Sequence, residues 1–241
     1  MAAKPKIRSL GSSLRDLLIL VIGIVLSFTL TEWRQNKADL NEEKRIIGLI
    51  YSDLKEDTTN INSNLELLES LKSGFDSILS YRNRPSEADP VQVLRWAYSV
   101  VNFVPFDPNR TGYIQLSNHK NSGALKNKKI LTSIIGLFND EYETLNTLNE
   151  SHKDLLLNQM TPKYFSWIPF LEKPTDLNEK NIAQLRALLN DNEFLNMLQF
   201  ELILKINLEK QYANSLESIE SILQLIETDY GEDFVSENIA D

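Results

Sequence analysis

The sequence contains no cysteine, so disulfide bonds, thiolate metal sites and cysteine nucleophiles are excluded. It also has only two histidines, eight glycines and eight prolines among its 241 residues. With so few helix breakers, this composition favours long helices over a turn-rich sheet protein. A chain of this length can bury a substantial core without covalent cross-links.

Acidic residues outnumber basic residues by 34 to 25, which gives a formal net charge of −9. The first 16 residues hold four of the basic residues and a single acidic one, so the rest of the chain carries a net charge of −12. Phosphate backbones and anionic lipid surfaces repel a body of this charge. Nucleic acid is therefore not an expected partner.

One long apolar run lies near the N-terminus. It reads LLILVIGIVLSFTLT from Leu17 to Thr31, fifteen residues without a charge. A membrane-spanning helix needs roughly 20 such residues, and Leu14 and Trp33 extend the run to about that length, with Trp33 at an interfacial position. We predict a membrane anchor over residues 17–33, which includes Leu17, Ile19, Val21, Ile22, Ile24, Val25, Phe28 and Trp33. A cleaved signal peptide and a buried core helix are the alternatives, but the run has no small-x-small cleavage site and no polar face.

The orientation of the anchor depends on the lysines and arginines beside it. Four lie on the N-terminal side and four on the C-terminal side, so the positive-inside rule is nearly tied. Acidic residues are mixed with the second group, at Glu32, Asp39, Glu42 and Glu43, which weakly favours a cytoplasmic N-terminus. We expect the body to lie outside the cytoplasm.

Two segments of the body repeat apolar residues every seven positions. The first repeat is Ile47, Leu54, Ile61, Leu68 and Phe75, and the second is Leu195, Leu202, Leu216 and Leu223. Asp57 and Asn64 interrupt the first segment, and Lys205 and Glu209 interrupt the second, which favours a bundle over a continuous two-stranded coiled coil. Each segment predicts a helix about 55 Å long, and the two helices should pair as the spine of the body.

The regions between these helices contain most of the prolines. Asp89-Pro90 is a helix start, the stretch 104–110 is a break with two prolines, and a further helix is expected from Lys128 to about Leu157. Residues 160–175 are predicted to be an aromatic-rich loop. The sequence thus predicts an all-α fold, an N-terminal transmembrane helix followed by an elongated antiparallel helical bundle. Its segments are a basic tail (1–16), the anchor (17–33), the bundle (34–230) and an acidic C-terminal tail (231–241).

Four short motifs add a resemblance to this pattern. They are Asp16-Leu-Leu-Ile-Leu-Val-Ile-Gly-Ile-Val-Leu with Glu32-Trp33, Asp53-Leu54-Lys-Glu-Asp57, Tyr113-Ile-Gln-Leu and Asn121-Ser-Gly123. Together, over about residues 14–150, the chain resembles an uncharacterised family of Bacteroidota single-pass membrane proteins, a domain of unknown function. It departs from that family at Asp16, where glutamate is usual, and in the additional His119-Lys120. The resemblance implies a single-pass membrane protein with a helical body, and it carries over no catalytic residue. We expect the chain in a bacterial inner membrane.

The residues that could support catalysis lack the spacing that it needs. His119 and His152 have no ligand partners at helical spacing, so both are expected at the surface. Ser117 and Lys120 match the S-x-x-K spacing of some hydrolases without the companion motifs. The carboxylates near Asp57 and Asp140 are expected on solvated helix faces. We therefore expect no enzyme, cofactor or metal site.

The irregular stretch 103–123 is the candidate recognition segment, because polar and aromatic residues in irregular backbone often bind partners. Its candidate residues are Asp107, Arg110, Tyr113, Gln115, Asn121 and Gly123. The alternative is a structural connection packed on the bundle. We expect an interaction or scaffold protein that binds the bilayer and another envelope protein or a second copy, with Gly23 and Ser27 allowing close approach of two anchors. A helical sensor of small molecules that signals through a partner is the second hypothesis.

Overall fold

The computed structural model describes residues 10–82, 84–100, 102–118, 127–168, 171, 176–231 and 234, and these form helices with no β-strand among them. The helices are α1 (Leu10–Ser80), α2 (Pro90–Val100), α3 (Thr111–Asn118), α4 (Lys128–Gly136), α5 (Tyr142–Asp154), α6 (Thr161–Trp167), α7 (Glu179–Leu188) and α8 (Asn192–Tyr230), with π-helical turns η1 (Leu137–Glu141) and η2 (Leu155–Met160). The all-α class is confirmed.

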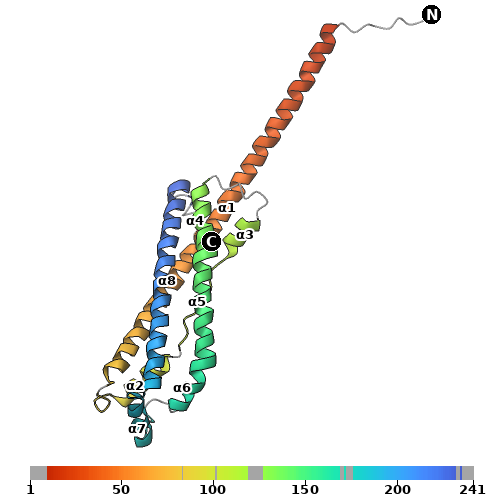
Figure 1. Cartoon of the computed structure of the whole chain (residues 1–241). Coiled ribbons are helices and arrows are strands. Elements are labelled where there is room, and N and C mark those ends of the chain that lie inside the picture. The colour runs from red at the N-terminus through yellow and green to blue at the C-terminus, as the bar shows by residue number, and fades with distance from the viewer. Residues whose placement is uncertain are drawn as a thin grey trace, which may run out of the picture.

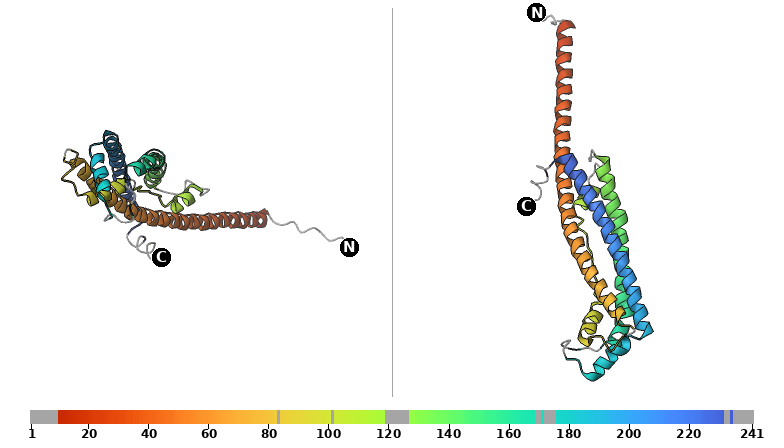
Figure 2. Two further views of the ribbon diagram at one scale, coloured as in Figure 1. Left: turned by 90° about the horizontal axis from the view of Figure 1, so that it is seen from below. Right: turned by 90° about the vertical axis from the view of Figure 1, so that its left-hand side faces the viewer.

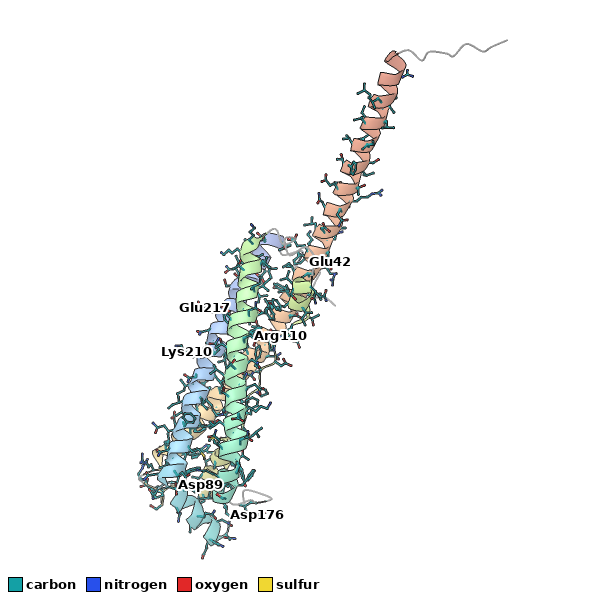
Figure 3. All side chains as sticks on the ribbon, turned by 45° about the vertical axis from the view of Figure 1, so that its right-hand side comes forward. Glu42, Asp89, Arg110, Asp176, Lys210 and Glu217 are labelled. Atoms are coloured by element: carbon teal, nitrogen blue, oxygen red, sulfur yellow. The ribbon has the colours of Figure 1, made fainter. Side chains whose placement is uncertain are left out.

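Helix α1 is one unbroken helix of 71 residues, about 107 Å long at 1.5 Å per residue. Its N-terminal part stands away from the rest of the chain, with side chains projecting on all sides (Figures 2 and 3). The large apolar side chains from Leu17 to Trp33 are 47–71% exposed. This part of α1 is long and apolar enough to span a membrane by length and composition.

The body is an elongated bundle in which the chain changes direction three times (Figure 1). The chain runs away from the exposed apolar part along α1, and returns through α2, an extended segment 102–110, and α3. It then runs away again along α4 to α6, and α8 brings it back. We call residues 102–110 the strap, since this segment takes the place that a second antiparallel helix would have in a four-helix bundle.

The core follows the first seven-residue repeat on α1, whereas on α8 it follows the neighbouring row Leu198, Tyr212, Ile219 and Ile226, and Leu202 and Leu216 of the second repeat are only half-buried. Ile47, Leu54, Ile61, Leu68 and Phe75 are each fully buried, and α1 and α8 pack along each other. The predicted pairing of the two long helices is therefore present. A third long helix completes the body, because α4, η1, α5, η2 and α6 follow one another without a break from Lys128 to Trp167.

The predicted loop over residues 160–175 is wrong in its first half, because the helix continues through Pro162 to Trp167. Proline lacks an N–H group, and its ring collides with the carbonyl four residues earlier in a regular α-helix. The wider turn η2 precedes it, and both the backbone N–H and the Oγ1 of Thr161 donate to the Leu156 carbonyl, the latter at 2.6 Å. This local widening accommodates the proline without ending the helix.

Helix α3 was not predicted, because its eight residues are too few for a clear periodic pattern. Its position depends on Gly112, where a Cβ atom would lie 2.6 Å from the backbone nitrogen of Ile50. The Gly112 N–H donates to Asp53 Oδ2 at 2.7 Å. A residue without a side chain therefore lets α3 lie directly on the backbone of α1.

Candidate functional site

The strap packs against the helices of the bundle with one side buried: Val104 and Phe106 are buried, while Asn102, Pro105 and Asp107 are exposed. The Phe106 ring meets the rings of Tyr142 and Tyr212 edge-on, at centroid distances of 5.4 and 5.9 Å. An extended segment in such a place has neither a helix nor a neighbouring strand to bond its backbone groups, and buried backbone groups need partners. The partners must come from side chains of the surrounding helices.

Polar side chains on α1 and α8 provide these partners. The Lys205 ammonium donates to the Asn102 carbonyl (3.0 Å), the Tyr212 hydroxyl to the Val104 carbonyl (3.2 Å) and the Asn64 amide to the Pro105 carbonyl (3.1 Å), while Asp57 Oδ1 accepts from the Asn109 N–H (3.0 Å). Three of these residues, Asp57, Asn64 and Lys205, are interruptions of the apolar repeats. Their polarity is explained by the strap.

Asp57 is fully buried, which corrects the expectation that it lies on a solvated face. Its second oxygen accepts from the Tyr142 hydroxyl at 2.8 Å. Burial raises the pKa of Asp57 to about 6, although the hydrogen bonds from Asn109 and Tyr142 oppose the shift. Burial also raises the pKa of Tyr142, and the charge of Asp57 adds to that effect.

A second buried polar group joins α5 to α8. His152 Nε2 lies 2.5 Å from Glu201 Oε1, and Lys205 Nζ lies 3.0 Å from the same oxygen. All three side chains are fully buried, so the expectation of a surface position for His152 is wrong. His152 shares a helix face with Leu145 and Asn149, which the sequence pattern around a single histidine did not reveal. Burial lowers the pKa of Lys205, while the Glu201 carboxylate opposes this shift.

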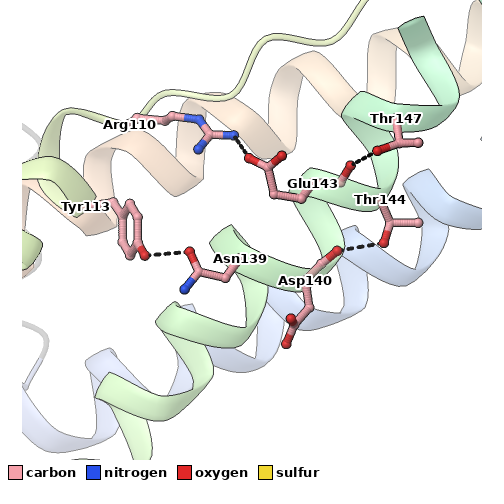
Figure 4. Close-up of polar contacts among 7 residues, drawn as sticks. All are labelled: Arg110, Tyr113, Asn139, Asp140, Glu143, Thr144 and Thr147. Atoms are coloured by element: carbon pink, nitrogen blue, oxygen red, sulfur yellow. Dashed lines mark hydrogen bonds and ion pairs between the residues drawn. The ribbon is translucent and has the colours of Figure 1, made fainter. Parts of the chain in front are cut away.

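The candidate recognition residues are divided between internal contacts and the surface. Arg110 bonds Glu143 at 3.2 Å, and the Tyr113 hydroxyl donates to Asn139 Oδ1 at 2.7 Å (Figure 4). Gln115 Oε1 accepts from Arg45 at 2.6 Å.

The remaining candidate recognition residues either face solvent or lie outside the described residues. Asp107 is exposed on the strap, and Asn121 and Gly123 lie outside the described residues. The hydroxyl of Ser117, the hydrolase candidate, donates to the Ile114 carbonyl. The described polar side chains of this segment therefore hold α3 and the strap to α1 and to the helix 128–167. The role of residues 103–123 in recognition stays a prediction.

A groove lies at the end of the bundle that is distant from the exposed apolar part of α1, between η2, α6 and the start of α8. It has a volume of about 580 Å³, and its apolar lining includes Leu155, Met160, Met197 and Phe200. Lys163 forms an ion pair with Glu193 beside it. No sequence pattern indicated this groove, because its lining comes from helices that are far apart along the chain.

No group of three or more histidine, aspartate or glutamate residues in the described part of the chain could hold a metal ion. Comparison with protein-family models, with curated proteins and with solved structures finds no match.

Proposed function

We propose that this protein is a membrane-anchored, non-enzymatic interaction or scaffold protein of the bacterial cell envelope. Residues 17–33 span the inner membrane, the N-terminus lies in the cytoplasm, and the bundle extends into the periplasm. Its partner is another envelope protein or a second copy of the chain.

The continuity of α1 is the observation that carries this proposal. The exposed apolar part and the buried part, which begins near Ile46, belong to the same helix, so the bundle is held at a fixed distance from the bilayer. From Ile46 to Ser80 the helix reaches about 50 Å further. A rigid body of this length suits a protein that presents a surface to a partner at a defined height.

The use of the interior polar groups supports the same proposal. Lys205, Asn64 and Asp57 bond the strap, and Arg110 and Tyr113 bond the helix 128–167. Because these side chains already bond other parts of the chain, a partner protein would bind to the outer faces of the helices or to the anchor.

Sidedness is tested with single cysteines, which the cysteine-free chain allows without background. Ser151→Cys lies on the exposed face of α5, and Ser9→Cys lies in the basic tail. In spheroplasts, a membrane-impermeant maleimide should label the Ser151→Cys variant and should reach the Ser9→Cys variant only after lysis. The opposite result would place the body in the cytoplasm and direct the search to cytoplasmic partners.

The interaction itself is tested by photo-cross-linking from exposed positions of each long helix in native membranes. We expect products heavier than the 27.7 kDa chain from at least one helix face. A chain that stays at its own mass at all positions, while the anchor holds it in the membrane, would contradict the proposal.

The groove beside Met197 favours a second candidate, a sensor that binds a small apolar molecule. Its volume of about 580 Å³ is within the usual range of ligand pockets. Met197→Trp would fill the groove and Ser151→Cys would leave it intact, so a ligand should raise the melting temperature of the second variant only. Equal shifts in both variants would remove the groove from consideration.

A further inference from the structure

The outer face of α8 carries an apolar patch within an uncharged stretch. Phe200, Ile203 and Ile206 are 46–51% exposed. All exposed positions of α8 between Glu193 and Lys210 are uncharged, and we call them the α8 outer face: Asn196, Gln199, Phe200, Ile203, Ile206 and Asn207. Lys210 and Glu217 follow on the same side of the helix (Figure 3).

The other long helices have charged outer faces. The exposed side of α1 includes Glu56, Glu66 and Asp76, and that of α5 includes Glu143 and Glu150. Two copies of such a face would bring like charges together, which opposes association. The α8 outer face avoids this repulsion in a body whose net charge is strongly negative.

Distance separates this face from the bilayer. The Tyr230 hydroxyl donates to Glu43 near the anchor end of the body, and Ile203 lies about 40 Å from Tyr230 along α8. A lipid surface is therefore not the occupant of the patch. A protein surface of matching neutral, apolar character is required.

Anchoring in one bilayer makes a second copy fit that requirement. Two copies that enter the membrane from the same side stand parallel, so the two-fold axis that relates them runs along the membrane normal. Identical residues then face each other at the same height. A face used in this way must be free of charge at the axis, as the α8 outer face is.

We infer that two copies of the chain associate in parallel through the α8 outer face, with Ile203 of one copy against Ile203 of the other. This inference rests on the proposed membrane-anchored interaction function and names its partner. The contact ends toward the membrane at Lys210, because this lysine would face its own copy.

The contact is weak without the membrane. Each of the three side chains leaves about half of its surface exposed, so together they offer on the order of 250 Å² per copy. A stable soluble dimer needs about 800 Å² per partner. Confinement in the bilayer raises the effective concentration and compensates for the small area.

The test uses full-length single-cysteine variants in native membranes, oxidised with copper phenanthroline. Phe200→Cys and Ile203→Cys report the α8 outer face. Ser73→Cys on α1 and Ser151→Cys on α5 are controls at a similar height, since their neighbours Phe75 and His152 contact Lys205 and Glu201. A disulfide forms only when the two Cα atoms come within about 7 Å, so the reaction selects residues near the axis.

We expect a product of twice the 27.7 kDa chain mass from the Phe200→Cys and Ile203→Cys variants and not from the controls. Adding Ile203→Glu to Phe200→Cys should reduce that product about tenfold or more, because both copies lose apolar area and gain opposed carboxylates. Equal yields at the control positions, or an unchanged yield with Ile203→Glu, would overturn the inference. Cross-links to a protein of different mass would also overturn it but would leave the proposed interaction function in place.

Discussion

Replacing Asp57 with asparagine should remove a specific pH dependence of folding stability. Asp57 is fully buried, and its pKa is about 6 in the folded state against its usual 3.8. A pKa difference of one corresponds to about 1.36 kcal/mol, so the folded state favours the protonated carboxyl by ~3 kcal/mol. The folded state binds this proton more tightly than the unfolded state. The stabilisation of the folded state by the protonated Asp57 carboxyl is therefore fully present below pH ~4 and is lost as the pH rises through 6.

Asparagine imitates the protonated carboxyl at this position. Its Oδ1 can still accept from the Asn109 N–H, and its amide can donate to the Tyr142 oxygen. Both hydrogen-bonding partners of Asp57 are therefore retained in the variant. The free energy of unfolding of wild type minus that of Asp57→Asn should fall by ~3 kcal/mol between pH 4 and pH 7.

The measurement is urea unfolding of the full chain in detergent, followed by circular dichroism at several pH values. Glu56→Gln is the matched control, since it removes one carboxylate from an exposed position beside Asp57 and leaves the buried carboxyl in place. A difference for Asp57→Asn that is flat from pH 4 to pH 7, or that grows with pH, would refute the reasoning.

Two further predictions concern close contacts in the body, both read from unfolding curves. Gly112→Ala should destabilise the fold by ~3 kcal/mol, because the added Cβ meets the Ile50 backbone, whereas Gly136→Ala has open space and should stabilise its helix by ~0.5–1 kcal/mol. An unchanged stability of Gly112→Ala would show that α3 does not lie on α1. Lys205→Met should cost ~3–5 kcal/mol, because it leaves buried Glu201 without its cation, and adding Glu201→Gln should restore part of the loss. A double variant that is less stable than Lys205→Met would contradict this account.

The repeat of apolar residues made α1 and α8 predictable. Ile47 to Phe75 and Leu195 to Leu223 keep a seven-residue period over several turns, and only a helix places such residues on one face. The exposed apolar run before them was equally clear, since its length and the lack of charge are local properties. Shorter or irregular elements were less clear. Helix α3 has eight residues, and the continuation through Pro162 depends on the widened turn η2, which is set by tertiary packing.

The burial of single polar residues could not be predicted in the same way. Asp57 and His152 each lie on a helix where most polar residues face solvent and a few, such as Glu43 and Asn149, are buried. Sequence position alone does not separate the two cases. The interruptions at Asp57, Asn64 and Lys205 were visible, but their common partner was not. The strap that they bond is joined to them only by contacts across 41 to 103 residues of sequence.

The sequence by itself determined the helical class, the candidate membrane anchor and the two long helices, because composition and periodicity act through neighbouring turns of one helix. Only the tertiary structure decided the continuation of the third long helix through Pro162 to Trp167, the strap with its polar partners, the Lys205–Glu201–His152 cluster and the groove beside Met197. These features arise where segments distant in sequence meet, and a backbone segment in the interior takes whatever hydrogen-bonding partners the surrounding helices place beside it.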